Sequence, residues 1–320
     1  MAKVLITAEL PESTYRYFDD SGIEVVAYQE KTLITHKQLL DLVLDVDYII
    51  SALSTTIDRE IIDAAPKLKF IANFGAGYNN IDVAYAKSKQ IFVSNTPLVS
   101  TNSVAEVTLG LILDLNHRIT EGDKVTRSGK FTGWAPTYFL GNEIAGKTLG
   151  VFGFGNIGQA VARKAVALSM KIQYWQPRRL SDPEERDLGA KYVPFDELVK
   201  TSDVISINAP LNSTSRHRFD LDVFKAMKNT AQLINVGRGP IVDESDLVIA
   251  LKQGMIAGAP LDVYENEPEV DAGLIGLDNV VLTPHIGNAT VEARDAMAKI
   301  VAQNILAVNQ DKPTKFIVNN

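Results

Sequence analysis

The hydrophobic residues of this chain fall into short runs that are separated by polar segments of helical character. In the first hundred residues, runs such as KVLIT, DYIISAL and KFIANFG alternate with segments such as IDREIIDAAPKL. A second series starts with LGVFGFG and continues through VISINAP, AQLINVG and VVLTPH. Short apolar strands that alternate with helices predict βαβ units and parallel sheets. The predicted fold class is therefore α/β, with two doubly wound parallel sheets rather than one.

Two longer segments of helical pattern interrupt this alternation. Residues 100–125 have apolar positions at helical spacing after a Ser-Thr start, which predicts one long helix that links two lobes. Residues 288–310 predict another helix after the last strand, and we expect it to return to the first lobe. The predicted domains are residues 1–99 plus 288–320 and residues 100–287.

Composition narrows the function classes. The chain has 320 residues, a net charge of -7 and no block of Lys and Arg, which argues against nucleic-acid or membrane-surface partners. It has no cysteine, which excludes disulfides and thiolate chemistry, and only four histidines, which argues against a metal site. No leader-like segment and no apolar run of about 20 residues is visible, so we expect a cytoplasmic protein.

The strongest local motif is a glycine-rich turn between a strand and a helix. Gly153, Gly155 and Gly158 form G-x-G-x-x-G around Asn156 and Ile157, after the strand LGVF and before the helical segment QAVARKAVAL. This context predicts the phosphate-binding turn of a Rossmann dinucleotide site, with tight packing of the turn as the alternative.

The next strand ends in residues that bear on the choice of dinucleotide. NAD sites usually place a carboxylate there, whereas this chain has Gln176 followed by Arg178 and Arg179. Because arginine can bind a phosphate with two parallel hydrogen bonds, this sequence favours NADP, with NAD as the alternative. Both arginines could instead be solvated loop charges.

Three titratable residues follow apolar runs in the last third of the chain: Arg238, Glu267 and His285. A guanidinium can bind a carboxylate, and histidine is the natural proton donor near neutral pH. Arg238 could instead cap a helix or pair with Asp243. For the carboxylate beside the histidine, Glu265 competes with Glu267, as does Glu269.

Several motifs in order along the chain resemble those of the D-isomer-specific 2-hydroxyacid dehydrogenase family. They are FGAGYNNIDV, GFGNIG, NVGRGPIVDESDLVIAL, GAPLDVYENEP and LTPHIGNAT, and together they cover essentially the whole chain. The segment GWAP and the Gln-Arg pair are most similar to the glyoxylate and hydroxypyruvate reductase branch. The resemblance implies a flavodoxin-like substrate lobe and a Rossmann cofactor lobe with a cleft between them. It also implies NAD(P)H-dependent reduction of small 2-oxoacids to D-2-hydroxyacids.

The resemblance implies roles for individual residues. Arg238 would bind the substrate carboxylate, His285 would donate the proton, and Glu267, which matches the family's Glu-Pro pair, would favour the protonated imidazole. The implied substrate contacts, besides Arg238 and His285, are Leu53, Ala76, Gly77 and Trp134. The further implied cofactor contacts are Thr108, Pro210, Ser215, Val236, Asp262 and Gly287. Trp134 could act in a partner subunit or simply pack, and the apolar helix 104–119 suggests the face of a homodimer.

Two rival functions remain open at this point. An NAD-linked dehydrogenase of bulkier 2-oxoacids or phosphoglycerate would share the same motifs. A cofactor-sensing scaffold would share the fold without needing the Arg, Glu and His set.

Overall fold

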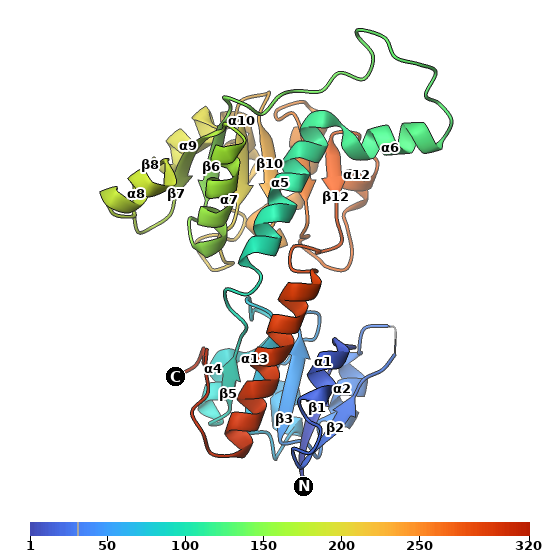
Figure 1. Ribbon diagram of the computed structural model, residues 1–320, viewed down its shortest axis with the longest axis vertical. Coiled ribbons are helices and arrows are strands. Elements are labelled where there is room, and N and C mark those ends of the chain that lie inside the picture. The colour runs from blue at the N-terminus through green and yellow to red at the C-terminus, as the bar shows by residue number, and fades with distance from the viewer. Residues whose placement is uncertain (31) are drawn as a thin grey trace. The chain divides into compact units, whose positions relative to one another are not determined.

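The computed structural model describes residues 1–30 and 32–320. These residues form two compact units, one of residues 1–100 with 289–320 and the other of residues 101–288. Each unit contains one sheet whose strands are all parallel, with helices on its faces (Figure 1). The predicted α/β class with two parallel sheets is confirmed.

The first unit has a five-stranded sheet of flavodoxin-like order, β2-β1-β3-β4-β5. Its strands are β1 (Ala2–Ile6), β2 (Ile23–Ala27), β3 (Tyr48–Ala52), β4 (Phe70–Phe74) and β5 (Phe92–Ser94). Its helices are α1 (Glu12–Arg16), α2 (His36–Leu42), α3 (Arg59–Ala64), α4 (Val83–Ser88) and α13 (Val291–Asn309). The strand order reverses between β1 and β3, and open α/β sheets bind ligands outside the carboxyl ends of the strands at such a reversal.

Helix α13 completes the first unit from the far end of the sequence. Side chains alternate across β1, so that Val4 and Ile6 face the cluster that contains α13, while Leu5 faces the cluster that contains α2 and α3. Both faces of the sheet are thus buried, as parallel sheets require.

The second unit has a seven-stranded sheet with the order β12-β11-β10-β9-β6-β7-β8. Its strands are β6 (Thr148–Phe152), β7 (Lys171–Trp175), β8 (Ala190–Tyr192), β9 (Val204–Ile207), β10 (Gln232–Asn235), β11 (Ala259–Leu261) and β12 (Val280–Leu282). Its helices are α5 (Thr101–His117), α6 (Ile119–Arg127), α7 (Asn156–Ala167), α8 (Asp182–Leu188), α9 (Phe195–Thr201), α10 (Leu221–Ala226), α11 (Glu244–Lys252) and α12 (Ala272–Ile275), with a 3-10 turn at Gly239–Ile241. Counted from β6, this is the Rossmann order with one added strand, and the order reverses between β6 and β9.

The single long helix predicted for residues 100–125 is wrong, because the structure has two helices there. Arg118, between α5 and α6, adopts a left-handed conformation with φ of 55°. Asp114 accepts hydrogen bonds from the Thr120 N–H at 2.6 Å and from the Thr120 hydroxyl at 2.5 Å. The Asp114 side chain thus supplies an acceptor to the first turn of α6. Among the described helices, none is both long enough and apolar enough to cross a membrane.

Candidate functional site

The three glycines after β6 meet three different local requirements. Gly153 has φ of 91°, and a Cβ atom there would lie 2.5 Å from the backbone nitrogen of Ala209. A Cβ on Gly158 would lie 2.3 Å from the Gly153 carbonyl oxygen. A Cβ on Gly155 would meet no atom within 4 Å, so this glycine borders open space. Backbone conformation requires glycine at 153, and close packing of the helix requires it at 158. At Gly155 the missing side chain leaves the backbone accessible.

The first turn of α7 presents donors to that open space. Gly155 is the N-cap residue of α7 and has no side chain to cap the helix. The N–H groups of Asn156 and Ile157 have no acceptor among the residues that the structure describes. Such a helix start favours an anion, through its free donors and its dipole. These residues fit the pyrophosphate of a dinucleotide.

The structure distinguishes the two arginines that follow β7. Arg179 binds Glu185 with two hydrogen bonds of 2.8 and 2.7 Å, and its guanidinium also lies 3.1 Å from Asp182. The Arg178 guanidinium is exposed and makes no hydrogen bond or ion pair with another described residue. The Gln176 amide accepts from the Phe154 N–H at 3.2 Å and donates to the Arg178 carbonyl at 2.7 Å. Gln176 thus links the glycine-rich turn to the segment after β7, in which the Arg178 guanidinium has no ion-pair partner among the described residues.

His285 and Glu267 form a direct pair in the second unit. His285 Nδ1 lies 2.8 Å from Glu267 Oε2, and Glu267 Oε1 accepts the Tyr264 N–H at 3.0 Å. Burial acts to raise the pKa of Glu267, but the His285 hydrogen bond and charge, the Tyr264 N–H and the charge of Arg238 together hold that pKa below its ordinary value. An ionised carboxylate only accepts, so His285 Nδ1 carries the hydrogen, and Nε2 has no hydrogen-bond partner among the described residues.

Arg238 follows β10 and is half-buried. Burial lowers the pKa of its guanidinium, and the charge of Glu267 acts in the opposite direction. The only hydrogen bond of the guanidinium within the described chain runs to the Gly237 carbonyl at 2.7 Å, so the Arg238 side chain neither caps a helix nor pairs with Asp243. A charge so placed has donors left for an anionic ligand.

Asp262 holds the segment that carries His285. Its carboxylate is buried and accepts from the Ile286 N–H at 2.8 Å, the Gly287 N–H at 2.8 Å and the Thr283 hydroxyl at 2.6 Å. His285 itself has φ of 53°, a conformation that non-glycine residues rarely adopt without support. Asp262 and Gly287 were predicted as cofactor contacts, and the structure adds that they fix the backbone on either side of Ile286.

A second histidine and carboxylate pair lies beside the first. His217 Nε2 is 2.6 Å from Glu265 Oε1, and Glu244 accepts the Glu265 N–H at 2.6 Å. Burial raises the pKa of Glu244. Glu265 is therefore occupied by another partner, which leaves Glu267 as the carboxylate bound to His285. From the sequence, Glu244 was not singled out, and His217 was interpreted as incidental because it lies in a polar segment.

In the first unit, two side-chain amides and one backbone N–H donate hydrogen bonds that hold the loop after β4. Asn73 Nδ2 donates to the carbonyls of Gly75 and Gly77, at 3.1 and 2.7 Å, and Asn95 Nδ2 donates to that of Ala76 at 2.7 Å. The Thr96 N–H also donates to the Gly75 carbonyl. With these carbonyls held, the N–H groups of Ala76 and Gly77 have no acceptor in the described part of the chain. Consecutive free N–H groups can bind an anion, so this pair is a candidate anion nest.

The remaining predicted residues lie in varied surroundings. Leu53 packs against Gly75, where a Cβ would come within 2.5 Å of its side chain. The Ser215 hydroxyl donates to the Pro210 carbonyl at 2.8 Å and Val236 is buried beside β10. The Thr108 hydroxyl is buried and donates to the Val104 carbonyl, whereas Trp134 is 83% exposed.

Comparison with known proteins shows which family the chain belongs to. The model of the family described as D-isomer specific 2-hydroxyacid dehydrogenase, NAD binding domain, matches residues 109–287, more than half of the chain. A protein of Staphylococcus saprophyticus, provisionally named 2-hydroxyacid dehydrogenase, is 50% identical over 320 residues and all of both chains. This chain belongs to the D-isomer-specific 2-hydroxyacid dehydrogenase family.

Solved structures of related proteins cover nearly the whole chain. A glyoxylate reductase from Paecilomyes thermophila is 33% identical, with a TM-score of 0.87 over 99% of this chain and 98% of that one. An NADPH-dependent glyoxylate/hydroxypyruvate reductase from Sinorhizobium meliloti, solved with NADP and malonate, is 32% identical, with a TM-score of 0.86 over 99% of this chain and 96% of that one. As a 2-hydroxyacid dehydrogenase, this protein is an oxidoreductase with a nicotinamide-dinucleotide domain that acts on small 2-oxoacids or 2-hydroxyacids.

Proposed function

We propose that this 2-hydroxyacid dehydrogenase reduces small 2-oxoacids such as glyoxylate or hydroxypyruvate to D-2-hydroxyacids, with NADPH as the preferred cofactor. The observation that carries the proposal is the His285–Glu267 pair, 2.8 Å long, in the same unit as a half-buried Arg238 that has no carboxylate bonded to it. Reduction of a 2-oxoacid needs a proton donor and a cation for the substrate, and these residues supply both.

Each residue of the trio has one task in this reaction. Arg238 binds the substrate carboxylate and draws electron density from the carbonyl. Glu267 stays ionised because its pKa is lowered, so it holds His285 Nδ1–H and leaves Nε2 to protonate the carbonyl oxygen. A bound nicotinamide would supply the hydride for the carbonyl carbon. Asp262 keeps His285 in place through the N–H groups of the two residues that follow it.

The first unit has candidate donors of its own for a carboxylate. The free N–H groups of Ala76 and Gly77 suit a carboxylate, and Leu53 beside Gly75 would limit the substrate side chain. Asn73 and Asn95 would act indirectly, by fixing the carbonyls of the loop.

The preference for NADPH rests on the segment after β7. Gln176 carries no charge that would repel a 2′-phosphate, and the Arg178 guanidinium is unpaired among the described residues. The Sinorhizobium meliloti relative was solved with NADP. NADH remains the alternative. Arg179 is the weaker candidate for phosphate binding, because Glu185 and Asp182 already engage it.

A homodimer is part of the proposal. Phe131, Trp134 and Leu140 are 54%, 83% and 64% exposed in the segment after α6, which runs out from the rest of the second unit (Figure 1). Exposed apolar side chains of this kind mark protein interaction surfaces. Helix α5, which we had expected at the dimer face, buries most of its apolar residues against its own unit, chiefly along α7.

A steady-state assay of cofactor absorbance at about 340 nm tests the function. Glyoxylate and hydroxypyruvate should be reduced with NADPH more efficiently than with NADH, and the product should be the D-isomer. Faster turnover of bulky 2-oxoacids or 3-phosphohydroxypyruvate with NADH would favour the dehydrogenase alternative. Cofactor binding without turnover of any 2-oxoacid would favour the scaffold alternative.

A further inference from the structure

An arginine near the start of α13 has no hydrogen-bond or ion-pair partner among the described residues. Arg294 lies in the first turns of this 19-residue helix and is half-buried, yet no hydrogen bond or ion pair joins its guanidinium to another of the described residues. Burial lowers the pKa of Arg294, and no nearby carboxylate opposes this effect. Burying a cation costs free energy unless a counterion is supplied. The protein thus retains a cation that its own side chains do not neutralise.

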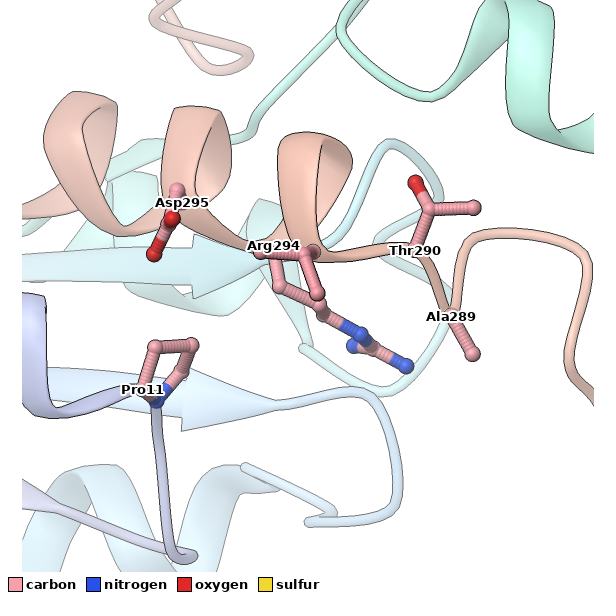
Figure 2. Close-up of a pocket in the computed structure, with 6 residues that line it drawn as sticks. Pro11, Ala289, Thr290, Arg294 and Asp295 are labelled. Atoms are coloured by element: carbon pink, nitrogen blue, oxygen red, sulfur yellow. The ribbon is translucent and has the colours of Figure 1, made fainter.

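A cavity of about 330 Å³ lies beside Arg294, entirely within the first unit (Figure 2). It is lined by Pro11, Ala289, Thr290, Val291, Arg294 and Asp295. The Arg294 side chain leads away from Asp295 and towards the Ala289 end of the cavity. The Asp295 carboxylate accepts from the Ser13 hydroxyl of α1 at 2.8 Å. The Asp295 carboxylate is thus bonded on the α1 side rather than to Arg294, and the guanidinium is the one cation among the described lining residues.

The position of the cavity in the fold is where such sheets bind ligands. Pro11 lies beyond the carboxyl end of β1, next to the reversal of strand order between β1 and β3. The Arg294 guanidinium carbon lies 5.8 Å from the ring centre of Phe74. Phe74 is the last residue of β4, directly before the loop with the free N–H groups of Ala76 and Gly77. Arg294 and the anion nest thus flank the same strand end.

We propose that Arg294 and this cavity form a second anion subsite, which binds the distal carboxylate of a 2-oxodicarboxylate while the nest at Ala76 and Gly77 binds the first. This deepens the proposed function and rests on it. A carboxylate fits better than a phosphate, because Arg294 is the single cation among the described lining residues and a phosphate carries more negative charge than one guanidinium balances. The volume exceeds what one carboxymethyl group needs, so a four- or five-carbon substrate can be accommodated.

The kinetic test compares two substrates of similar length, oxaloacetate and 2-oxobutanoate. In Arg294→Gln, the ratio of kcat/KM for oxaloacetate to that for 2-oxobutanoate should fall about tenfold or more, mainly through KM, since a charge-assisted hydrogen bond is lost. Lys299→Gln removes one positive charge from an exposed position of the same helix and should leave the ratio unchanged. An unchanged ratio in Arg294→Gln, or an equal loss for both substrates, overturns the subsite.

A binding measurement keeps this test separate from that of the enzymatic function. Malonate titrated calorimetrically into the full-length wild-type protein should bind about tenfold more tightly than into Arg294→Gln, with Lys299→Gln resembling the wild type. Circular dichroism of the three proteins checks that each is folded. Equal malonate affinity for the wild type and Arg294→Gln refutes the subsite even if 2-oxoacids are reduced. A selective loss supports the subsite even if no 2-oxoacid is turned over.

Discussion

Residue identity matters most at His285. Its imidazole is positioned by Glu267 at one ring nitrogen and by Asp262 through the N–H groups of the following residues. Neither support depends on the proton that the other nitrogen would donate. Because the Asp262 bonds run to backbone N–H groups, they can persist when the imidazole is replaced.

His285→Gln should lower kcat by about 10²- to 10⁴-fold, because glutamine cannot donate a proton as a general acid. Cofactor affinity should stay near that of the wild type, as measured by fluorescence titration with NADPH. His36→Gln, at an exposed histidine that pairs with Asp58 in the first unit, serves as the matched control. Wild-type turnover in His285→Gln would remove this residue from the chemistry.

Neighbouring residues of one type can also have different roles, as Arg178 and Arg179 illustrate. Arg178→Ala should reduce the preference for NADPH over NADH about tenfold, because a guanidinium that binds a phosphate is lost. Arg179→Ala should leave the preference near that of the wild type and mainly destabilise the fold, because it frees Glu185. The measurement is kcat/KM with both cofactors, together with thermal unfolding. The reverse pattern would assign the phosphate to Arg179.

At the scale of elements, the loop from Tyr264 to Glu267 follows β11. It carries Glu267, which binds the proposed proton donor, His285. Glu244 at the start of α11 accepts the Glu265 N–H, and His217 binds the Glu265 carboxylate. These contacts tie the loop to α11 and to the segment after β9. The orientation of Glu267 thus depends on residues that do not touch His285.

Two substitutions at Glu244 separate its hydrogen bond from its charge. Glu244→Ala leaves the Glu265 N–H without its acceptor and should lower the free energy of unfolding by about 1–3 kcal/mol, with a lower kcat. Glu244→Gln keeps an oxygen acceptor and should retain most activity. The two variants can be compared by urea unfolding and steady-state kinetics, and equal losses would show that the charge itself is needed.

The pH dependence at Glu244 has a defined sign. Because the folded-state pKa is raised above the ordinary value of about 4.5, the stability that this group contributes is present below that value and lost as pH rises through the folded pKa. Relative to the wild type, Glu244→Gln should therefore gain stability between about pH 4 and pH 7. Urea unfolding at both pH values measures this, and a constant difference would contradict the raised pKa.

At the scale of the whole molecule, the exposed apolar segment after α6 predicts self-association. Light scattering should give the mass of a dimer for the wild type. Replacing Trp134 and Leu140 together by serine should shift the mass towards a monomer, because both side chains are largely exposed in the single chain. Ile249→Ser, at an exposed position of α11, is the control. A monomeric wild type would refute the proposed dimer.

Much of the fold could be predicted from the pattern of the chain. Short, nearly continuous apolar runs bounded by turns indicate buried parallel strands, and helical spacing between them indicates crossovers. The break at Arg118 could not be predicted, because the helical pattern continues through it and the conformation depends on Asp114 binding Thr120.

The site was predicted to different degrees. Chemistry-bearing residue types at strand ends singled out Arg238 and His285, and the glycine spacing singled out the phosphate turn. The carboxylate partner of His285 was ambiguous, because Glu265 and Glu267 are two residues apart. Their contacts separate them: Glu265 binds His217, and Glu267 binds His285.

The sequence by itself determined the class of fold, the dinucleotide turn and the family, because these depend on local spacing and on residue types at strand ends. The tertiary structure decided which charges are already paired. Arg179 is engaged by Glu185, Asp262 by the backbone around Ile286, and Glu265 by His217, while Arg178, Arg238 and Arg294 have no carboxylate bonded to them among the described residues. The Asp262 and Glu265 pairings join segments 24 and 48 residues apart, which local sequence does not encode, and even the Arg179–Glu185 pair spans six residues and depends on how the chain turns into α8.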